Sequence, residues 1–100
     1  MTENTELSEI FEDYLETILE LQETKHVARS KDIADRLDIK PGSVTANLKK
    51  LSEIKLINYE PYGYITLTPE GKKIAREIES RHIFLKDFFF RIIGLEEDIA

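Results

Sequence analysis

Residues 29–51 read RSKDIADRLDIKPGSVTANLKKL, a stretch that predicts two short helices separated by a tight break at 38–41. In its first half, Ser30 is the expected N-cap, and the apolar side chains after it fall on one helical face: Ile33, Ala34 and Leu37. In its second half, Pro41 suits the first helical position, because the N–H that proline lacks would be unpaired there anyway. Two short helices joined in this way predict a helix-turn-helix.

The second helix of this pair has one apolar face and one polar, basic face. Val44, Leu48 and Leu51 form an inward stripe at spacings of four and three residues. The residues expected to face outward are Lys40, Ser43, Thr45, Ala46, Asn47, Lys49 and Lys50. Small residues allow close approach to the major groove, hydroxyl and amide groups can reach base edges, and lysines can hold phosphates. From this stretch alone, a DNA-reading helix and an ordinary hairpin with a solvated lysine face are about equally favoured.

The distribution of charge favours the DNA-reading interpretation although the net charge of the chain is −6. Residues 1–25 carry one lysine and eight acidic residues, a charge of −7. Residues 26–76 carry ten Lys or Arg against six acidic residues, a charge of +4, and residues 77–100 carry the remaining −3. The basic segment coincides with the helix-turn-helix and the residues immediately after it. A DNA-facing middle flanked by acidic segments is therefore expected.

Length and composition exclude several other classes of protein. One hundred residues make one domain, or one domain and the start of a second. The absence of cysteine excludes a disulfide framework and thiolate chemistry. No apolar run of about 18 residues predicts a membrane span, and the acidic N-terminus lacks the features of a signal peptide, so a cytoplasmic protein without membrane contact is expected. There is no phosphate loop or nucleophile–base set, so we do not expect an enzyme.

The segments around the helix-turn-helix predict a winged helix. Residues 6–24 form an amphipathic helix with an acidic outer face, and 25–28 form a connector that could include a short strand. Residues 56–60 and 64–68 are rich in β-branched and aromatic residues around a turn, which predicts a hairpin that would be the wing. Tyr62 is a candidate DNA contact, although closing the hairpin is an equally good role for it, and packing is favoured for Tyr64. The predicted fold class is therefore mainly α with a small β-hairpin.

A long helix is expected after the wing. Thr68 is its predicted N-cap and Pro69 its first residue, and Gly71 should weaken its first turn by roughly 1 kcal/mol relative to alanine. From Ile78 onward the segment is apolar on all sides, so residues 83–93 are expected to be covered by a second subunit or by more chain. Gly94 is the predicted stop of this helix, with another helix beginning after it. We therefore expect a winged-helix domain at 1–75 and the start of a helical dimerisation and metal-binding region at 76–100.

Residues 8–94 resemble the diphtheria-toxin-repressor-like family of metal-dependent transcription regulators, and within it the manganese-responsive branch. The matching motifs occur in the family's order: EDYLETILEL at 12–21, SKDIADRLDIKPGSVTANLKKL at 30–51, YITLTPEGKKIA at 64–75, RH at 81–82 and RIIG at 91–94. The resemblance implies a winged helix, a helical dimerisation region and a metal site at their junction. It also implies a homodimer that binds a palindromic double-stranded DNA operator when metal is bound, and so represses genes of metal-ion homeostasis.

The resemblance implies three metal ligands in this chain: Asp13, Glu16 and His82. Oxygen ligands with one imidazole suit Mn²⁺ or, alternatively, Fe²⁺. Methionine stands at the position of Asp13 in the iron-responsive branch, so Asp13 indicates manganese. The accessory site of that branch is not expected, because Ile83 and Lys86 replace the arginine and glutamate it needs. Without the resemblance, the acidic residues would be interpreted as solvated and His82 as an ordinary core or surface histidine.

The family's remaining ligands come from a helix that begins about where this chain ends. The metal site is therefore expected to be incomplete in these 100 residues, which we expect to be part of a longer protein. Ala46 stands where relatives can have a longer polar side chain, so few base contacts are expected there. Two alternatives stay open from the residues: a metal-independent winged-helix regulator of the multiple-antibiotic-resistance type, and a winged helix used for protein–protein interaction.

Overall fold

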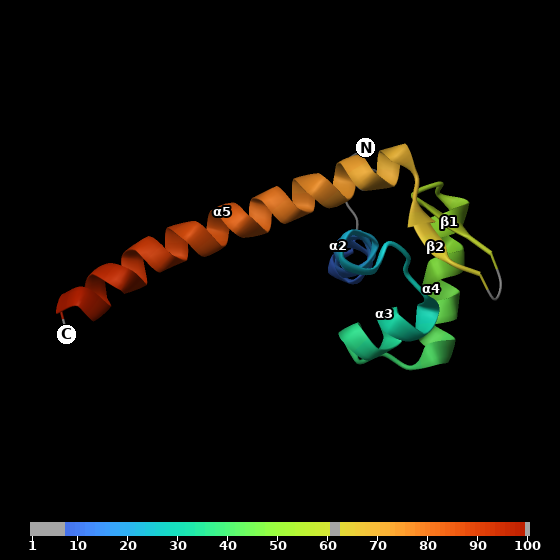
Figure 1. Ribbon diagram of the computed structural model, residues 1–100, viewed down its shortest axis with the longest axis horizontal. Coiled ribbons are helices and arrows are strands. Elements are labelled where there is room, and N and C mark those ends of the chain that lie inside the picture. Colours follow the sequence, from blue (N-terminus) through green and yellow to red (C-terminus); the bar gives the residue numbers. More distant parts are fainter. Residues whose placement is uncertain (1–7, 61–62, 100) are drawn as a thin grey trace.

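The computed structural model describes residues 8–60 and 63–99, with side chains up to residue 92. The elements occur in the order α2 (Glu9–Lys25), α3 (Ser30–Leu37), α4 (Pro41–Glu53), β1 (Ile57–Tyr59), β2 (Ile65–Leu67) and α5 (Pro69–Ile99) (Figure 1). This arrangement confirms the predicted winged helix-turn-helix followed by a long helix. None of the helices in the described residues has an apolar stretch long enough to cross a bilayer.

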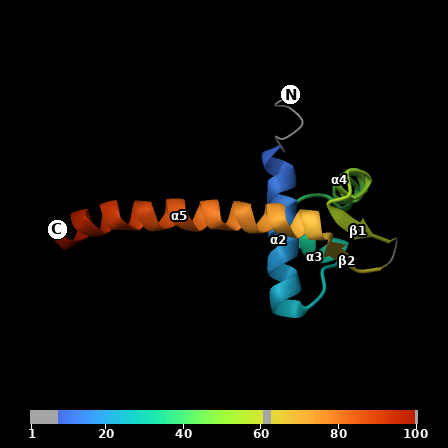
Figure 2. The ribbon, with the colours of Figure 1, turned by 90° about the horizontal axis from the view of Figure 1, so that it is seen from above.

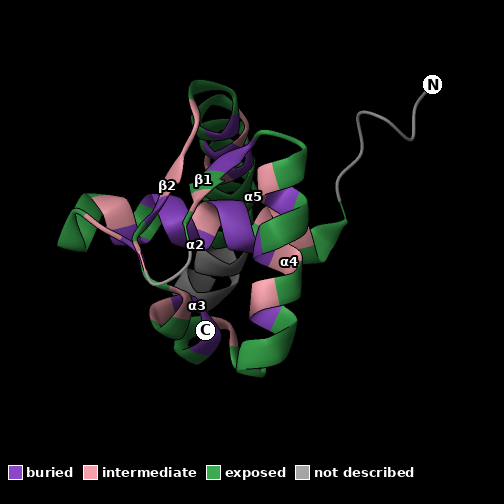
Figure 3. Ribbon diagram, turned by 90° about the vertical axis from the view of Figure 1, so that its right-hand side faces the viewer, coloured by how far each residue is buried: buried purple, intermediate pink, exposed green. Residues whose placement is uncertain are grey.

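Helix α2 is crossed by α5, and α4 and the hairpin lie together on one side of it (Figure 2). Ser8 is its N-cap and accepts a hydrogen bond from the N–H of Phe11 at 3.2 Å. Residues 6 and 7, which were predicted to belong to this helix, lie outside the described residues. Its inward side chains are fully or almost fully buried: Tyr14, Leu15, Ile18, Leu19 and Leu21. Figure 3 shows this buried surface facing the hairpin and α4.

The two helices of the helix-turn-helix have the predicted bounds except at the first residue of α3. Val44, Leu48 and Leu51 of α4 are completely buried, and Pro41 is its first residue. The prediction that Ser30 is the N-cap of α3 is wrong, because Arg29 is the N-cap and Ser30 is the first helical residue. The physical reason lies just before the helix. The carbonyl of Ala28 accepts a hydrogen bond from the N–H of Ile65 at 2.8 Å, so the chain stays extended through Arg29 and turns helical at Ser30.

The wing is a two-stranded antiparallel hairpin with Ile57 opposite Leu67 and Tyr59 opposite Ile65. The bridge between Ala28 and Ile65 adds the predicted short extended piece of the 25–28 connector beside β2. Helix α2 also holds the wing directly, because the side chain of Gln22 accepts a hydrogen bond from the N–H of Leu67 at 2.9 Å. Tyr62, a predicted DNA contact, lies outside the described residues.

Helix α5 starts as predicted but ends later. The hydroxyl of Thr68 accepts a hydrogen bond from the N–H of Gly71 at 3.0 Å, which confirms the N-cap. The prediction that Gly94 stops the helix is wrong, because α5 continues to Ile99. One glycine costs about 1 kcal/mol in a helix, and the helix-favouring residues after it, Leu95, Glu96 and Glu97, offset that cost. The helix is also continuous across residues 75 and 76, so any boundary there lies within one helix.

The far part of α5 projects from the domain and exposes large apolar side chains. The exposed fraction is 68% for Phe84 and 67% for Phe90. The other large side chains exposed along this segment are Ile83, Leu85, Phe88, Phe89 and Ile92. These apolar side chains lie all around the helix. No side of this segment is fully covered by the rest of the described residues. This agrees with the prediction that residues 83–93 need further protein around them.

Gly71 allows the first turn of α5 to pass close to the backbone of Leu56, in the connection between α4 and β1. A Cβ at residue 71 would lie 1.9 Å from the carbonyl oxygen of Leu56, which already accepts a hydrogen bond from the N–H of Thr68 at 3.1 Å. Real Cβ atoms do not approach a carbonyl oxygen so closely, so the backbone would have to move. The close approach of two backbones explains why this turn contains the glycine that helix propensity disfavours.

We therefore expect Gly71→Ala to lower the free energy of unfolding by about 2 kcal/mol, a cost typical of overpacking. Gly42→Ala is the matched control, because a Cβ at residue 42 meets no atom within 4 Å and alanine favours the helix. Urea unfolding followed by circular dichroism measures both. Equal stabilities for the two variants would contradict the close approach at Gly71.

Candidate nucleic-acid interface and metal site

The outer face of α4 presents a short row of small and basic side chains. Lys40, Pro41, Ser43, Ala46, Lys49 and Lys50 are exposed, and Thr45 is half-buried. The first turn contains no acidic residue. The helix N-terminus, where partial positive charge gathers, therefore lies beside cations and a hydroxyl group. Such a surface is electrostatically suited to a polyanion.

Asn47 does not face outward as predicted. Its side chain is half-buried, and its amide nitrogen donates a hydrogen bond to the hydroxyl of Tyr14 on α2, at 3.1 Å. The prediction from helical spacing was wrong here because Asn47 lies at the edge of the apolar stripe, next to Leu48. A buried tyrosine hydroxyl needs a polar partner, and Asn47 supplies it from the facing helix.

A contact between the start of α3 and the wing was missed in the sequence. The guanidinium of Arg29 lies 5.1 Å from the centre of the Tyr64 ring and also donates a hydrogen bond to the Tyr64 hydroxyl at 3.3 Å. Arg29, Ser30 and Lys31 line one side of a hollow whose other side is formed by Tyr59, Gly63 and Tyr64. This places Ser30, half-buried, between two cations at the junction with the wing. The only signal in the sequence was the basic pair flanking Ser30.

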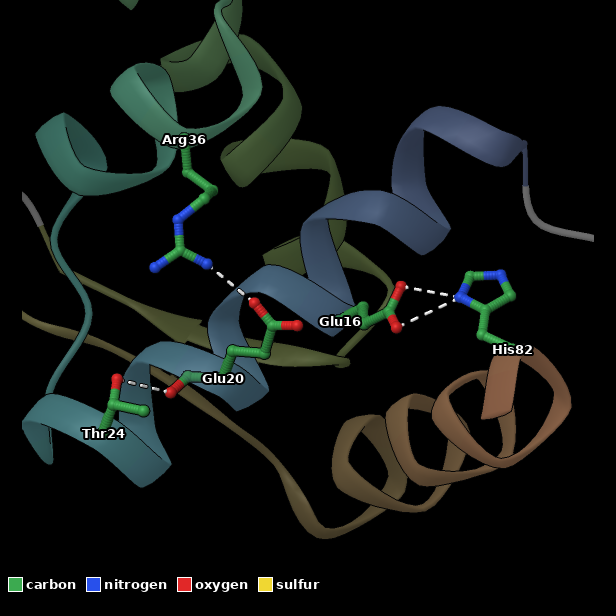
Figure 4. Close-up of polar contacts among 5 residues, drawn as sticks. All are labelled: Glu16, Glu20, Thr24, Arg36 and His82. Atoms are coloured by element: carbon green, nitrogen blue, oxygen red, sulfur yellow. Dashed lines mark hydrogen bonds and ion pairs between the residues drawn. The ribbon is translucent and has the colours of Figure 1, made fainter. Parts of the chain in front are cut away.

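The candidate metal ligands Glu16 and His82 meet where α2 and α5 cross. The carboxylate oxygens of Glu16 lie 3.0 and 3.1 Å from Nδ1 of His82, and Figure 4 shows the two side chains pointing toward one another. Glu16 is half-buried on α2, whereas His82 lies on the exposed flank of α5. The resemblance paired these residues across 66 positions of sequence, and the structure brings them into contact.

Asp13, the third implied ligand, is not gathered into this contact. It is exposed, and the described residues contain no group of three or more His, Cys, Asp or Glu side chains that could hold a metal ion. Asp13 lies one turn before Glu16 on the same helix, a spacing that allows two side chains to reach one site, but its side chain is exposed here. Two of the three implied ligands therefore meet in this structure.

Ion pairs surround the crossing and neutralise much of the acidic face of α2. Glu20 pairs with Arg36 of α3 at 2.7 Å, as Figure 4 shows, and Glu23 pairs with Arg76 of α5 at 2.8 Å. Arg81, next to His82, lies 3.8 Å from Glu12. The carboxylates of α2 thus link it to the helices on two sides.

Comparisons with known proteins agree with this geometry. The family model for the N-terminal DNA-binding domain of iron-dependent repressors matches residues 6–65. The HTH-type transcriptional regulator MntR of Bacillus pumilus (strain SAFR-032) is 45% identical over 87 residues, which are 87% of this chain and 60% of the relative. An uncharacterized HTH-type regulator of Methanocaldococcus jannaschii is 40% identical over 95 residues, or 94% of this chain and 76% of that protein.

Two solved structures have a similar fold. Lactococcus lactis ZitR in complex with DNA matches with a TM-score of 0.73 and 25% identity, over 87% of this chain and 60% of ZitR. Ligand-free NadR matches with a TM-score of 0.69 and 24% identity, over 87% of this chain and 66% of NadR, which shows a shared fold. The chain spans about 60% of the length of the MntR relatives it matches.

The family model covers more than half of the chain, and the MntR relatives share the segments that carry both the helix-turn-helix and the crossing of α2 with α5. The chain therefore belongs to the iron-dependent repressor family, in the branch that contains MntR.

Proposed function

We propose that this protein is a metal-dependent transcriptional repressor that binds a palindromic double-stranded operator as a homodimer and controls metal-ion homeostasis. Mn²⁺ is the proposed metal, and Fe²⁺ is the alternative. The observation that carries the proposal is the meeting of Glu16 and His82 at a helix crossing in a winged helix whose α4 has an exposed basic face. A repressor that binds an operator would act in the cytoplasm, and the proposal includes no enzymatic reaction.

The proposed DNA interface is centred on α4. Lys40, Lys49 and Lys50 would hold phosphates, while Ser43 and Thr45 would approach base edges and the small Ala46 would allow close contact. Pro41 and Ser30, at the starts of α4 and α3, would lie against the backbone of the DNA, and Tyr62 at the hairpin turn would extend the contact. Asn47 remains near the interface, but its amide nitrogen is engaged by Tyr14.

The ion pairs of α2 explain how an acidic protein can present a positive surface. Arg36, Arg76 and Arg81 are each paired with a carboxylate of α2, so the domain's own acids neutralise them. The three lysines of α4 have no acidic partner within 4 Å among the described residues. Among the described residues, Arg29, Lys31, Lys55, Lys72 and Lys73 also have no such partner, so the basic segment 26–76 carries the surplus positive charge, which supports DNA binding in spite of the net charge of −6.

The donor atoms at the helix crossing fit part of a divalent metal site. A carboxylate and an imidazole already face each other there, and oxygen with nitrogen is a donor set that Mn²⁺ and Fe²⁺ accept. When bound, the metal would supply positive charge between Glu16 and His82 and join α2 to α5 more firmly than a hydrogen bond can. Asp13 would be a further ligand.

The exposed apolar segment of α5 supports the homodimer. Phe84, Phe88 and Phe89 expose large side chains together on the described part of this segment. A monomer seldom exposes so many large apolar residues in one place, and a second copy of the same helix would remove them from water. Two copies would place two α4 helices on DNA, which is the symmetry that a palindromic operator requires.

We expect Lys49→Ala and Lys50→Ala each to lower affinity about equally for all DNA sequences. Each should also reduce the slope of log affinity against log salt by about 1, because one phosphate contact is lost.

Thr45→Val should instead alter preference at one base step by about 1–3 kcal/mol. Fluorescence anisotropy with duplexes selected from a random library measures these effects. Lys86→Ala, an exposed lysine far along α5, is the control. A salt slope that Lys49→Ala and Lys50→Ala leave unchanged would refute the phosphate contacts.

We expect His82→Ala and Asp13→Ala to reduce the Mn²⁺ affinity of the full-length protein by more than about tenfold, since loss of a supporting residue alone costs 10- to 100-fold. Isothermal titration calorimetry with Mn²⁺ measures this. Glu23→Gln is the matched control, because Glu23 is an acid of the same helix that pairs with Arg76. If both variants bind Mn²⁺ like the parent protein, the regulator is either metal-independent or uses other ligands.

A further inference from the structure

We propose that Asn47 is a positioning residue that, through the hydroxyl of Tyr14, ties the reading helix α4 to the segment of α2 that carries Asp13 and Glu16. This inference rests on the proposed function, and it assigns Asn47 a role other than base reading. In this role the hydrogen bond transmits a change at the metal ligands to the orientation of α4.

Tyr14 is well placed to transmit such a change. Its side chain is completely buried, and it stands directly after Asp13 and two residues before Glu16 in the same helix. A close-packed ring cannot move independently of its helix, so the hydroxyl moves with any rotation or shift of this part of α2. That hydroxyl accepts the hydrogen bond from Asn47 at 3.1 Å.

On α4, Asn47 stands at the boundary between the buried and the exposed face. Its neighbours are the exposed Ala46 and the fully buried Leu48. The hydrophobic effect that buries the apolar face of α4 is non-directional, so a directional contact at the edge of that face adds a further constraint on the rotation of the helix. A hydrogen bond is directional and weakens steeply when misaligned. Ser43 and Lys50, four residues before and three after, lie next to Asn47 on the helix surface, so fixing Asn47 also fixes their direction.

The direction of the Asn47 amide also argues against base reading. An asparagine that recognises adenine uses both its amide nitrogen and its oxygen toward the base. Here one N–H of that nitrogen donates to Tyr14 inside the domain, so the orientation of the amide is set from α2. The Tyr14 hydroxyl, rather than a base edge, therefore fixes the direction of the Asn47 amide in this structure.

Helix α2 holds the wing in a similar manner, which makes it a common support for both DNA-contacting elements. Gln22 lies two turns after Tyr14 on α2, and its side chain accepts a hydrogen bond from the N–H of Leu67 in β2. At the same helix, Glu16 contacts His82 of α5. A displacement of α2 relative to α5 would thus reach α4 through Tyr14 and the wing through Gln22.

A double-mutant cycle on the full-length protein tests the proposal with Tyr14→Phe, Asn47→Ala and the double variant. Affinity for an operator duplex selected from a random library is measured with saturating Mn²⁺ and with chelator. We expect each single variant to reduce the ratio of the two affinities by about tenfold, the loss of one hydrogen bond's contribution. The double variant should be no worse than either single variant, and base preference should not change.

Lys49→Ala is the control, because loss of a phosphate contact should lower both affinities and leave their ratio unchanged. Thermal unfolding is measured for every variant. If Tyr14→Phe does not fold, Asn47→Leu, which keeps the side-chain volume and the helix, is measured in its place. The proposal is overturned if the folded variants keep the parent's ratio, or if Asn47→Ala changes preference at one base step while Tyr14→Phe does not. If the parent protein binds the operator equally well with Mn²⁺ and with chelator, metal control is refuted. The double-mutant cycle without Mn²⁺ then decides whether Tyr14 and Asn47 act together on DNA affinity. Additive effects of the two substitutions would overturn the positioning role.

Discussion

Burial of one face of α2 is the interaction on which the rest of the structure depends. Its inward side chains, Tyr14, Leu15, Ile18 and Leu19, form the centre of the core on which the helix-turn-helix, the wing and the start of α5 pack. The edges of the same helix carry carboxylates that pair with cations of α3 and α5. Hydrophobic burial thus places α2, and the ion pairs orient the helices beside it.

This arrangement joins two surfaces that the sequence keeps apart. The candidate ligands Glu16 and His82 come from helices at opposite ends of the winged helix, and the reading helix lies between them in the sequence. In the fold, α2 contacts both the reading helix and α5, so the state of the helix crossing can affect how α4 is held. Within the described residues, Glu16 and His82 form a partial donor set at this crossing.

Local rules predicted those parts of the fold that depend on local forces. The stripe of Val44, Leu48 and Leu51, the proline at the start of α4 and the cap at Thr68 were confirmed because burial pattern and capping are encoded within a few residues. Ser30 and Gly94 were assigned wrongly by the same rules. Pairing of Ala28 with Ile65 moved the cap to Arg29, and helix-favouring neighbours carried α5 through Gly94.

The site was predicted less completely, because its contacts join distant segments. The resemblance identified Glu16 and His82, which periodicity alone would have assigned to solvent or core, whereas Asp13 remains apart from them here. Asn47 was misplaced because its partner, Tyr14, lies 33 residues earlier. Arg29 was missed because its contact with Tyr64 exists only once the wing folds against α3.

Coupling of metal binding to DNA binding through this domain is the centre of the proposed function. Coupling is reciprocal, so DNA must raise metal affinity by the factor by which metal raises DNA affinity. The most direct test is calorimetric titration of the full-length protein with Mn²⁺, with and without a saturating selected operator duplex. We expect Mn²⁺ binding that is about 5- to 150-fold tighter when the operator is present, the usual range of such coupling. Equal Mn²⁺ affinity with and without DNA would contradict the coupling.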